Sequence, residues 1–241
     1  KYNVMPVDKA SDPLTERPVV FFFFGDPGVG KTSLFNPAAK PILLDFDRGG
    51  SRAINRQDMV VINKWEDVQE EEKKGLFKDY STIGLDTAKA ALDDFLMAYV
   101  IQKDYKLAKN KLQAYGALGD EFKIFVSNRR SEQADLVIIA HAKDDKEGDI
   151  TKKLPDVTGQ SYALLMRIAD QVGYVTMRNN KRVIQFDPTD TTVGKNVAKF
   201  PVLEIPDSTD PKFKTFMADL IAKTKEAIRG NSEAQKEALE K

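Results

Sequence analysis

The sequence contains no cysteine and carries no net charge, and these two absences remove several classes of protein. Without cysteine the chain can form neither a disulfide framework nor a thiolate metal site. Its 37 lysines and arginines balance 37 aspartates and glutamates, so there is no overall basic field to attract nucleic acid. Any nucleic-acid partner must therefore bind to a local patch.

Long apolar runs are also missing. The longest apolar stretch falls far short of the roughly 20 residues that cross a bilayer, and the start, KYNVMPVDKASDPLTERP, is polar and unlike a signal peptide. We therefore expect no membrane contact and a cytoplasmic protein. The 241 residues are 41% hydrophobic, which is enough to bury a substantial core.

The stretch GDPGVGKTS has the spacing of a phosphate-binding loop, and it follows the apolar run VVFFFF. Gly28 and Gly30 permit backbone angles that turn successive N–H groups toward a triphosphate at the start of a helix. Lys31 would lie at the β- and γ-phosphates, and Thr32 would offer its hydroxyl to Mg²⁺. The alternative is a glycine-rich turn with an accidental lysine. The predicted binding residues for ATP and Mg²⁺ are Gly25, Asp26, Pro27, Gly28, Val29, Gly30, Lys31, Thr32 and Ser33.

Short, continuously apolar runs alternate with helical patterns along most of the chain. Such runs are typical of strands buried on both faces of a parallel sheet. The predicted strands are 19–24, 41–47, 59–62, 81–86, 135–141 and 171–177. Apolar residues recur at helical spacing within 92–100 and 118–126. The alternation predicts an α/β fold, with one doubly wound, mostly parallel central sheet flanked by helices.

The C-terminal part is predicted to contain a hairpin and a helix. In TMRNNKRVIQF, Asn179 and Asn180 suit a two-residue turn with positive φ angles. The last helix would bury an apolar stripe within 213–221, and the stretch after Gly230 is expected to be a frayed or exposed tail. We therefore divide the chain into an N-terminal extension (1–17), a core (18–229) and a tail (230–241).

Acidic residues close two of the predicted strands, at the edge where such sheets bind ligands. Asp86 is the candidate for holding Mg²⁺ opposite Thr32, and an N-cap of the following helix is a compatible second role. Asp45 and Asp47 close another strand, and Asp47 is the one expected to reach the nucleotide and to orient the attacking water. Alternatively, Asp47 pairs with Arg48 or Arg52 and only orders its loop.

His141 is the only histidine and closes the run DLVIIAH. At that position it could sense the γ-phosphate, or it could be a structural hydrogen-bonding group. We take it as a candidate catalytic residue together with Lys31 and Asp47.

Several segments together resemble the phage-encoded RecA-like ATPases, which correspond to the recombinase core alone and are implicated in single-strand DNA annealing and recombination. The resemblance covers about residues 18–205. The segments are GDPGVGKTS, PILLDFDRG, STIGLDTAKAALDDFL, QAYGALGDEF, DLVIIAHAKDD and DVTGQSYALLMRIADQVGYV.

This resemblance implies an ATP-hydrolysing homo-oligomer that acts on single-stranded DNA in the bacterial host cytoplasm, with a single-strand-binding protein as a candidate partner. It places Asp47 where recombinases have a catalytic glutamate, Asp86 at the Mg²⁺-associated aspartate, and His141 at a γ-phosphate-sensing glutamine. Aspartate is one methylene shorter than glutamate. The segment KDDKEGDITKKLPDVTGQ lies where recombinases have a mobile DNA-binding loop, although its acids offset its lysines.

RecA-like architecture normally places nucleotide at a subunit interface, where a neighbouring subunit supplies cations. Our candidates for these trans-acting cations are Arg178, Lys181 and Arg182, and the alternative is a solvated hairpin tip. Two other functions stay open. One is a nucleotide-gated DNA-binding module with little turnover. The other is a small-molecule kinase whose second phosphate is held by Arg48, Arg52, Arg129 or Arg130.

Overall fold

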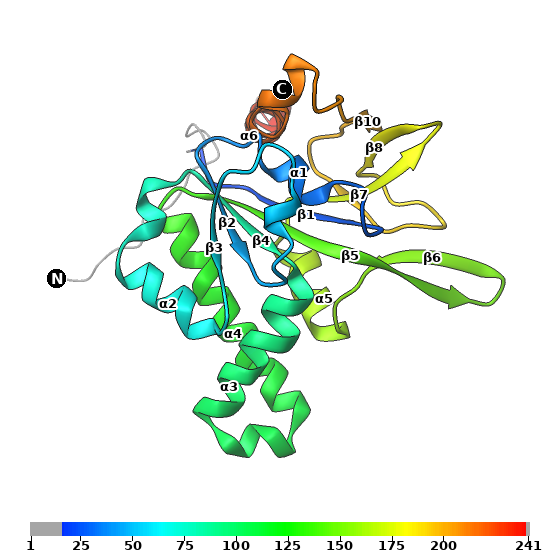
Figure 1. Ribbon diagram of the computed structural model, residues 1–241. Helices are drawn as coiled ribbons and strands as arrows, with labels where there is room; N and C mark the ends of the chain where they lie inside the picture. Colours follow the sequence, from blue (N-terminus) through cyan, green and yellow to red (C-terminus); the bar gives the residue numbers. More distant parts are fainter. Residues whose placement is uncertain (1–15, 240–241) are drawn as a thin grey trace.

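The computed structural model describes residues 16–239, and Figure 1 shows a central sheet with helices on both faces. The sheet has the strand order β10-β8-β7-β1-β5-β4-β2-β3, with β6 paired to β5 and β9 paired to β7. The strands are β1 (Val20–Gly25), β2 (Pro41–Asp45), β3 (Asp58–Val61), β4 (Thr82–Asp86), β5 (Asp135–Glu147), β6 (Ile150–Pro155), β7 (Gln171–Arg178), β8 (Lys181–Gln185), β9 (Lys195–Asn196) and β10 (Leu203–Glu204). All the predicted strands are present, and the pairs from β7 through β1, β5, β4 and β2 to β3 are parallel.

The helices form two layers (Figure 1). The α-helices are α1 (Lys31–Phe35), α2 (Trp65–Lys73), α3 (Met97–Lys103), α4 (Lys111–Ser131), α5 (Gly159–Ile168) and α6 (Phe216–Leu239). A π-helix, η3 (Ala90–Leu96), leads into α3, and the short 3₁₀ helices are η1 (Gly50–Arg52), η2 (Leu76–Asp79), η4 (Tyr105–Lys109) and η5 (Pro211–Thr215). Helices α2 to α5 cover one face of the sheet, and α1 and α6 cover the other.

Strand β1 shows why the central strands are apolar at every position. Phe22 and Phe24 pack into the cluster under α2 to α5, whereas Phe21 and Phe23 pack into the cluster under α1 and α6. Successive side chains of a strand point to opposite faces, so burial on both faces requires a continuous apolar run. The α/β fold with a mostly parallel sheet is confirmed.

Gly84 in β4 lets α1 lie close to the sheet. A Cβ atom at this position would lie 2.7 Å from the ring carbon Cζ of Phe35, which is the last residue of α1. The missing side chain therefore makes room for the phenyl ring, and the ring fixes the helix that follows the phosphate-binding loop.

The structure differs from the sequence-based expectation in one segment. Strand β5 continues to Glu147 and pairs in antiparallel register with β6, so the segment expected to be a mobile loop is a projecting β-hairpin. In the expected tail, the backbone of helix α6 stays helical past Gly230 to Leu239. The hairpin turn at Asn179 and Asn180 has the predicted positive φ angles, 49° and 60°. Residues 1–15 of the expected N-terminal extension lie outside the described residues.

Candidate nucleotide-binding site

The loop between β1 and α1 has the backbone that its glycines allow. Gly28 and Gly30 both have φ angles of 82°. The Lys31 ammonium turns back and donates to the carbonyl oxygens of Gly25 and Asp26, each at 2.9 Å. Burial lowers the pKa of Lys31, while the carboxylate of Asp86 opposes this shift. The ammonium of Lys31 is thus buried and bonded to backbone carbonyl oxygens. Phosphate oxygens can take the place of these carbonyl oxygens as its hydrogen-bond acceptors.

Thr32 and Asp86 lie together at the carboxyl ends of β1 and β4. The Thr32 hydroxyl donates to Asp86 Oδ2 at 2.6 Å. Burial raises the pKa of Asp86 to about 6, and the carboxylate of Asp47 adds to this shift. In residues 16–239 there is no group of three or more His, Cys, Asp or Glu side chains that could hold a metal ion by itself. One hydroxyl and one carboxylate fit Mg²⁺, which takes few protein ligands and keeps several waters.

The two aspartates after β2 have different surroundings. Asp45 is buried and accepts hydrogen bonds from the backbone N–H groups of Gly49 (3.0 Å) and Gly50 (2.9 Å), so it orders the loop. Asp47 lines the pocket beside the phosphate-binding loop and also accepts from Gly49 N–H at 3.0 Å. Arg48 donates to the side chain of Asn63 instead of pairing with Asp47. Asp47 is therefore the aspartate of this pair that lines the pocket, whereas Asp45 orders the loop.

His141 lies beside the loop because β5 pairs with β1, with His141 opposite Gly25. Its Nε2 atom is 3.9 Å from Asp47 Oδ2, and its Nδ1 atom is buried with no hydrogen-bond partner among the described residues. Burial, aided by the positive charge of Lys31, lowers the pKa of His141. This shift favours the neutral form of the ring, whose Nε2 atom lies on the side of Asp47.

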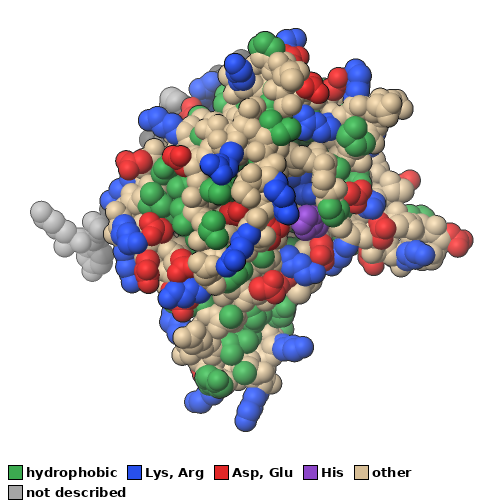
Figure 2. All heavy atoms as spheres, viewed as in Figure 1, with side chains coloured by type: hydrophobic (Ala, Val, Ile, Leu, Met, Phe, Trp, Pro, Cys, Tyr) green, Lys and Arg blue, Asp and Glu red, His purple; other side chains and the backbone are tan. Residues whose placement is uncertain are grey.

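These elements enclose a pocket of about 510 Å³, which is in the range of small-molecule sites. Its walls are the phosphate-binding loop, Asp47, Asp86 and His141. Figure 2 shows the single histidine between basic and acidic side chains on this face. Arg52 and Ile54 of the loop after β2 complete the wall. Sequence reasoning did not place Ile54 here, because nothing in a polar loop marks one apolar side chain as a pocket wall.

The structure separates the three cations expected to act on a neighbouring subunit. Arg182 lines the pocket of its own chain, and its Nη1 atom would be 2.8 Å from a Cβ atom built on Gly30. Arg178 instead donates to the side chain of Gln185, and Lys181 pairs with Glu204 at 2.8 Å. The hairpin therefore brings one guanidinium, that of Arg182, to the phosphate-binding loop of its own chain.

The arginines that would hold a second phosphate in a small-molecule kinase do not lie together. Arg129 is fully buried, stacks over Phe77 with its Cζ atom 4.2 Å from the ring centroid, and pairs with Glu72. It is thus a structural residue. Arg130 lies at the amino ends of the strands, away from the pocket, and Arg52 lines the pocket.

The β5–β6 hairpin is joined to the phosphate-binding loop through Lys153. Its ammonium group pairs with Asp26 Oδ1 at 3.1 Å and with Asp144 Oδ1 at 2.9 Å. Hydrogen bonds to these two carboxylates raise the pKa of Lys153. Lys143 donates to the carbonyl oxygen of Val157. Two lysines of the hairpin are therefore already engaged in contacts within the chain.

A phosphate-binding loop at the end of a central parallel strand, with a hydroxyl–carboxylate pair beside it, defines a P-loop NTPase. The family model described as AAA domain matches residues 17–197. The chain belongs to this family, and it is a nucleotide-binding NTPase domain. No curated protein matches the chain. Among the described residues, no helix is long and apolar enough to span a membrane.

Proposed function

We propose that this AAA-domain protein is an ATPase that acts on single-stranded DNA as an oligomer. The observation that carries the ATPase part is the convergence of Lys31, Thr32, Asp47, Asp86 and His141 on one pocket. The family supports nucleotide binding, and the sequence resemblance to recombinase cores supports the DNA substrate.

In the proposed reaction, a water oxygen bonds to the γ-phosphorus as the bond to the ADP oxygen breaks. Lys31 exchanges its carbonyl partners for phosphate oxygens, and Asp47 orients the water and receives its proton. Neutral His141 contacts Asp47 and reports the presence of the γ-phosphate. Arg182 adds positive charge from the same chain. Mg²⁺, held through Thr32 and Asp86, supplies charge neutralisation when it is bound.

The projection formed by α3, η4 and α4 supports the DNA part of the proposal. Tyr105 at its end is 81% exposed. Lys106, Lys109 and Lys111 form no salt bridge within the part of the chain that the structure describes. Figure 2 shows basic side chains at this lower end of the molecule. Single-strand binders combine cations that follow the backbone with aromatic rings on which bases stack.

The β5–β6 hairpin is less suited to DNA, although it occupies the position of the recombinase loop. The segment 143–155 carries four lysines and four acids, and two of those lysines are already engaged. We therefore assign DNA contact to the projection around Tyr105.

The test measures ATP turnover with and without a thymidine oligonucleotide, and oligonucleotide binding by fluorescence anisotropy. We expect DNA-stimulated turnover, and Tyr105→Ala should weaken binding about fivefold or more. Ile124→Ala removes another exposed apolar side chain, on α4 at 56% exposure, and serves as the matched control. Nucleotide-dependent DNA binding without turnover would favour the gated module. Absence of DNA binding would contradict the DNA assignment and leave the nucleotide site intact.

A further inference from the structure

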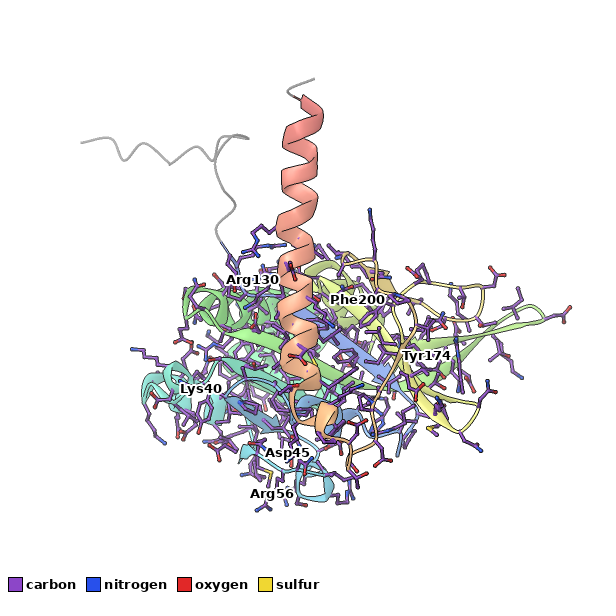
Figure 3. The ribbon with its side chains drawn as sticks, turned by 90° about the horizontal axis from the view of Figure 1, so that it is seen from above. Lys40, Asp45, Arg56, Arg130, Tyr174 and Phe200 are labelled. Atoms are coloured by element: carbon purple, nitrogen blue, oxygen red, sulfur yellow. The ribbon has the colours of Figure 1, made fainter. Side chains whose placement is uncertain are left out.

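A second pocket, of about 550 Å³, lies at the amino ends of the parallel strands. Its lining includes Arg130 and Asp170, and the residues after these two lead into β5 and β7. Figure 3 shows Arg130 and Asp45 toward opposite edges of the molecule. This pocket is therefore separate from the nucleotide pocket at the carboxyl ends.

The second pocket is basic. Its cations come from four separate segments: Arg17 precedes β1, Arg130 lies in the last turn of α4, Arg167 lies in the last turn of α5, and Lys195 begins β9. Asp170 is the only carboxylate among the described residues that line it. Four cations against one carboxylate make the pocket unfavourable for a metal ion and favourable for an anion.

Two of these cations already have partners. Arg17 pairs with Asp170 at 2.9 Å. Lys195 donates to the carbonyl oxygen of Ala169 at 2.5 Å and to that of Met166 at 3.4 Å, so it satisfies carbonyl groups at the end of α5. These contacts hold the pocket together, but they do not involve the guanidinium groups of Arg130 and Arg167, which stay available to bind an anion.

Arg130 and Arg167 are the groups with unused donors. Within residues 16–239, the one hydrogen bond of the Arg130 side chain is long, 3.5 Å from Nη2 to the carbonyl oxygen of Ile168. Its Nε atom is buried without a hydrogen-bond partner in residues 16–239. Arg167 forms no salt bridge there. A buried donor without an acceptor is costly, and a bound oxyanion would remove that cost.

We propose that this pocket binds a phosphate group, held by Arg130 and Arg167. Phosphate presents several oxygens, and the planar guanidinium donates to two of them at once. The group could belong to free phosphate or to the backbone of a nucleic acid strand, because both present the same oxygens. The binding site does not depend on ATP hydrolysis.

The experiment titrates pyrophosphate by calorimetry into Lys31→Ala protein, in which the phosphate-binding loop is impaired. We expect saturable binding that Arg167→Gln, added to this background, weakens about tenfold, because hydrogen bonds between charged groups are strong. Arg130→Gln should have a similar effect. Arg56→Gln is the matched control, since Arg56 is exposed and lies at the opposite edge (Figure 3).

Binding of a thymidine oligonucleotide, measured with the same variants, distinguishes the sources of the phosphate. Weaker oligonucleotide binding in Arg167→Gln supports a backbone contact, whereas an effect on pyrophosphate alone supports a free-phosphate site. Equal pyrophosphate affinity in all the variants, or no binding, would overturn the proposal. Arg167 is exposed, so its variant is expected to fold even if Arg130→Gln does not. Failure of the Tyr105→Ala test would not affect this result.

Discussion

The two edges of the parallel sheet carry different electrostatic environments. At the carboxyl ends, Lys31 and Arg182 share a pocket with Asp47 and Asp86. At the amino ends, a pocket of similar volume has four cations and Asp170 alone. Mixed charge suits a site that must hold Mg²⁺, water and phosphate together, whereas an excess of cations suits simple anion binding. This difference is the basis on which we propose chemistry at the carboxyl edge and anion binding at the amino edge.

The largest expected effect is at the carboxyl edge. Lys31→Ala should lower ATP turnover by about 100-fold or more, because it removes the cation that contacts the transferred phosphate. Turnover is measured by phosphate release, and circular dichroism checks the fold. Lys78→Ala removes an exposed lysine far from the pocket and should leave turnover unchanged. Equal rates in the wild type and a folded Lys31→Ala would refute the assignment.

The next effect separates the two aspartates after β2. Asp47→Asn should keep ATP affinity and reduce turnover about 100-fold, because an amide cannot accept the proton of the attacking water. Asp45→Asn should instead lower both affinity and thermal stability, since the carboxylate of Asp45 orders the loop through two N–H groups. Nucleotide titration measures affinity, phosphate release measures turnover, and thermal denaturation measures stability. Matching behaviour of the two variants would contradict the division of roles.

A smaller effect tests where Arg182 acts. Arg182→Ala should reduce turnover about tenfold or more, whereas Lys181→Ala should have little effect, because Lys181 is paired with Glu204 outside the pocket. Mixing Arg182→Ala with Lys31→Ala should restore no activity if Arg182 acts in cis. Restored activity in the mixture would show that the hairpin serves a neighbouring subunit.

The metal requirement should change more modestly. Asp86→Asn is expected to raise the Mg²⁺ concentration for half-maximal turnover severalfold, because it removes negative charge from the metal position opposite Thr32. The measurement is a Mg²⁺ titration of turnover at saturating ATP. An unchanged half-maximal concentration would exclude Asp86 from the metal shell.

The smallest effect is expected at the amino edge. Asp170 accepts from the backbone N–H of Val20 at 2.9 Å and pairs with Arg17. Asp170→Asn should therefore lower the free energy of unfolding by about 1 kcal/mol and should raise anion affinity at the second pocket. Urea denaturation and pyrophosphate titration measure these changes. Lower anion affinity would contradict the charge argument.

The sequence was most informative where the determining signals are local. The continuous apolar runs predicted the parallel strands, because burial on both faces leaves no position for polar residues. The loop around Lys31 is defined by spacing alone, and the positive φ angles of Asn179 and Asn180 follow from residue type. Placing Asp86 opposite Thr32 needed only the rule that ligands bind at the carboxyl ends of strands.

Features that depend on distant pairing could not be predicted in this way. The part of the hairpin in which β5 pairs with β6, residues 142–155, consists largely of charged residues, so no apolar run marks it as paired strands. The position of Arg182 depends on how β8 pairs with β7 and thereby approaches the loop after β1. The amino-edge pocket combines cations from segments far apart in the chain, including Arg17 and Lys195.

The ion pair between Lys153 and Asp26 couples binding at the β5–β6 hairpin to binding at the phosphate-binding loop. It connects a projecting two-stranded arm to the loop that must surround the triphosphate. A nucleotide that draws Asp26 away from Lys153 loosens the arm. By reciprocity of binding free energies, a partner that pulls the arm away then changes nucleotide affinity by the same factor.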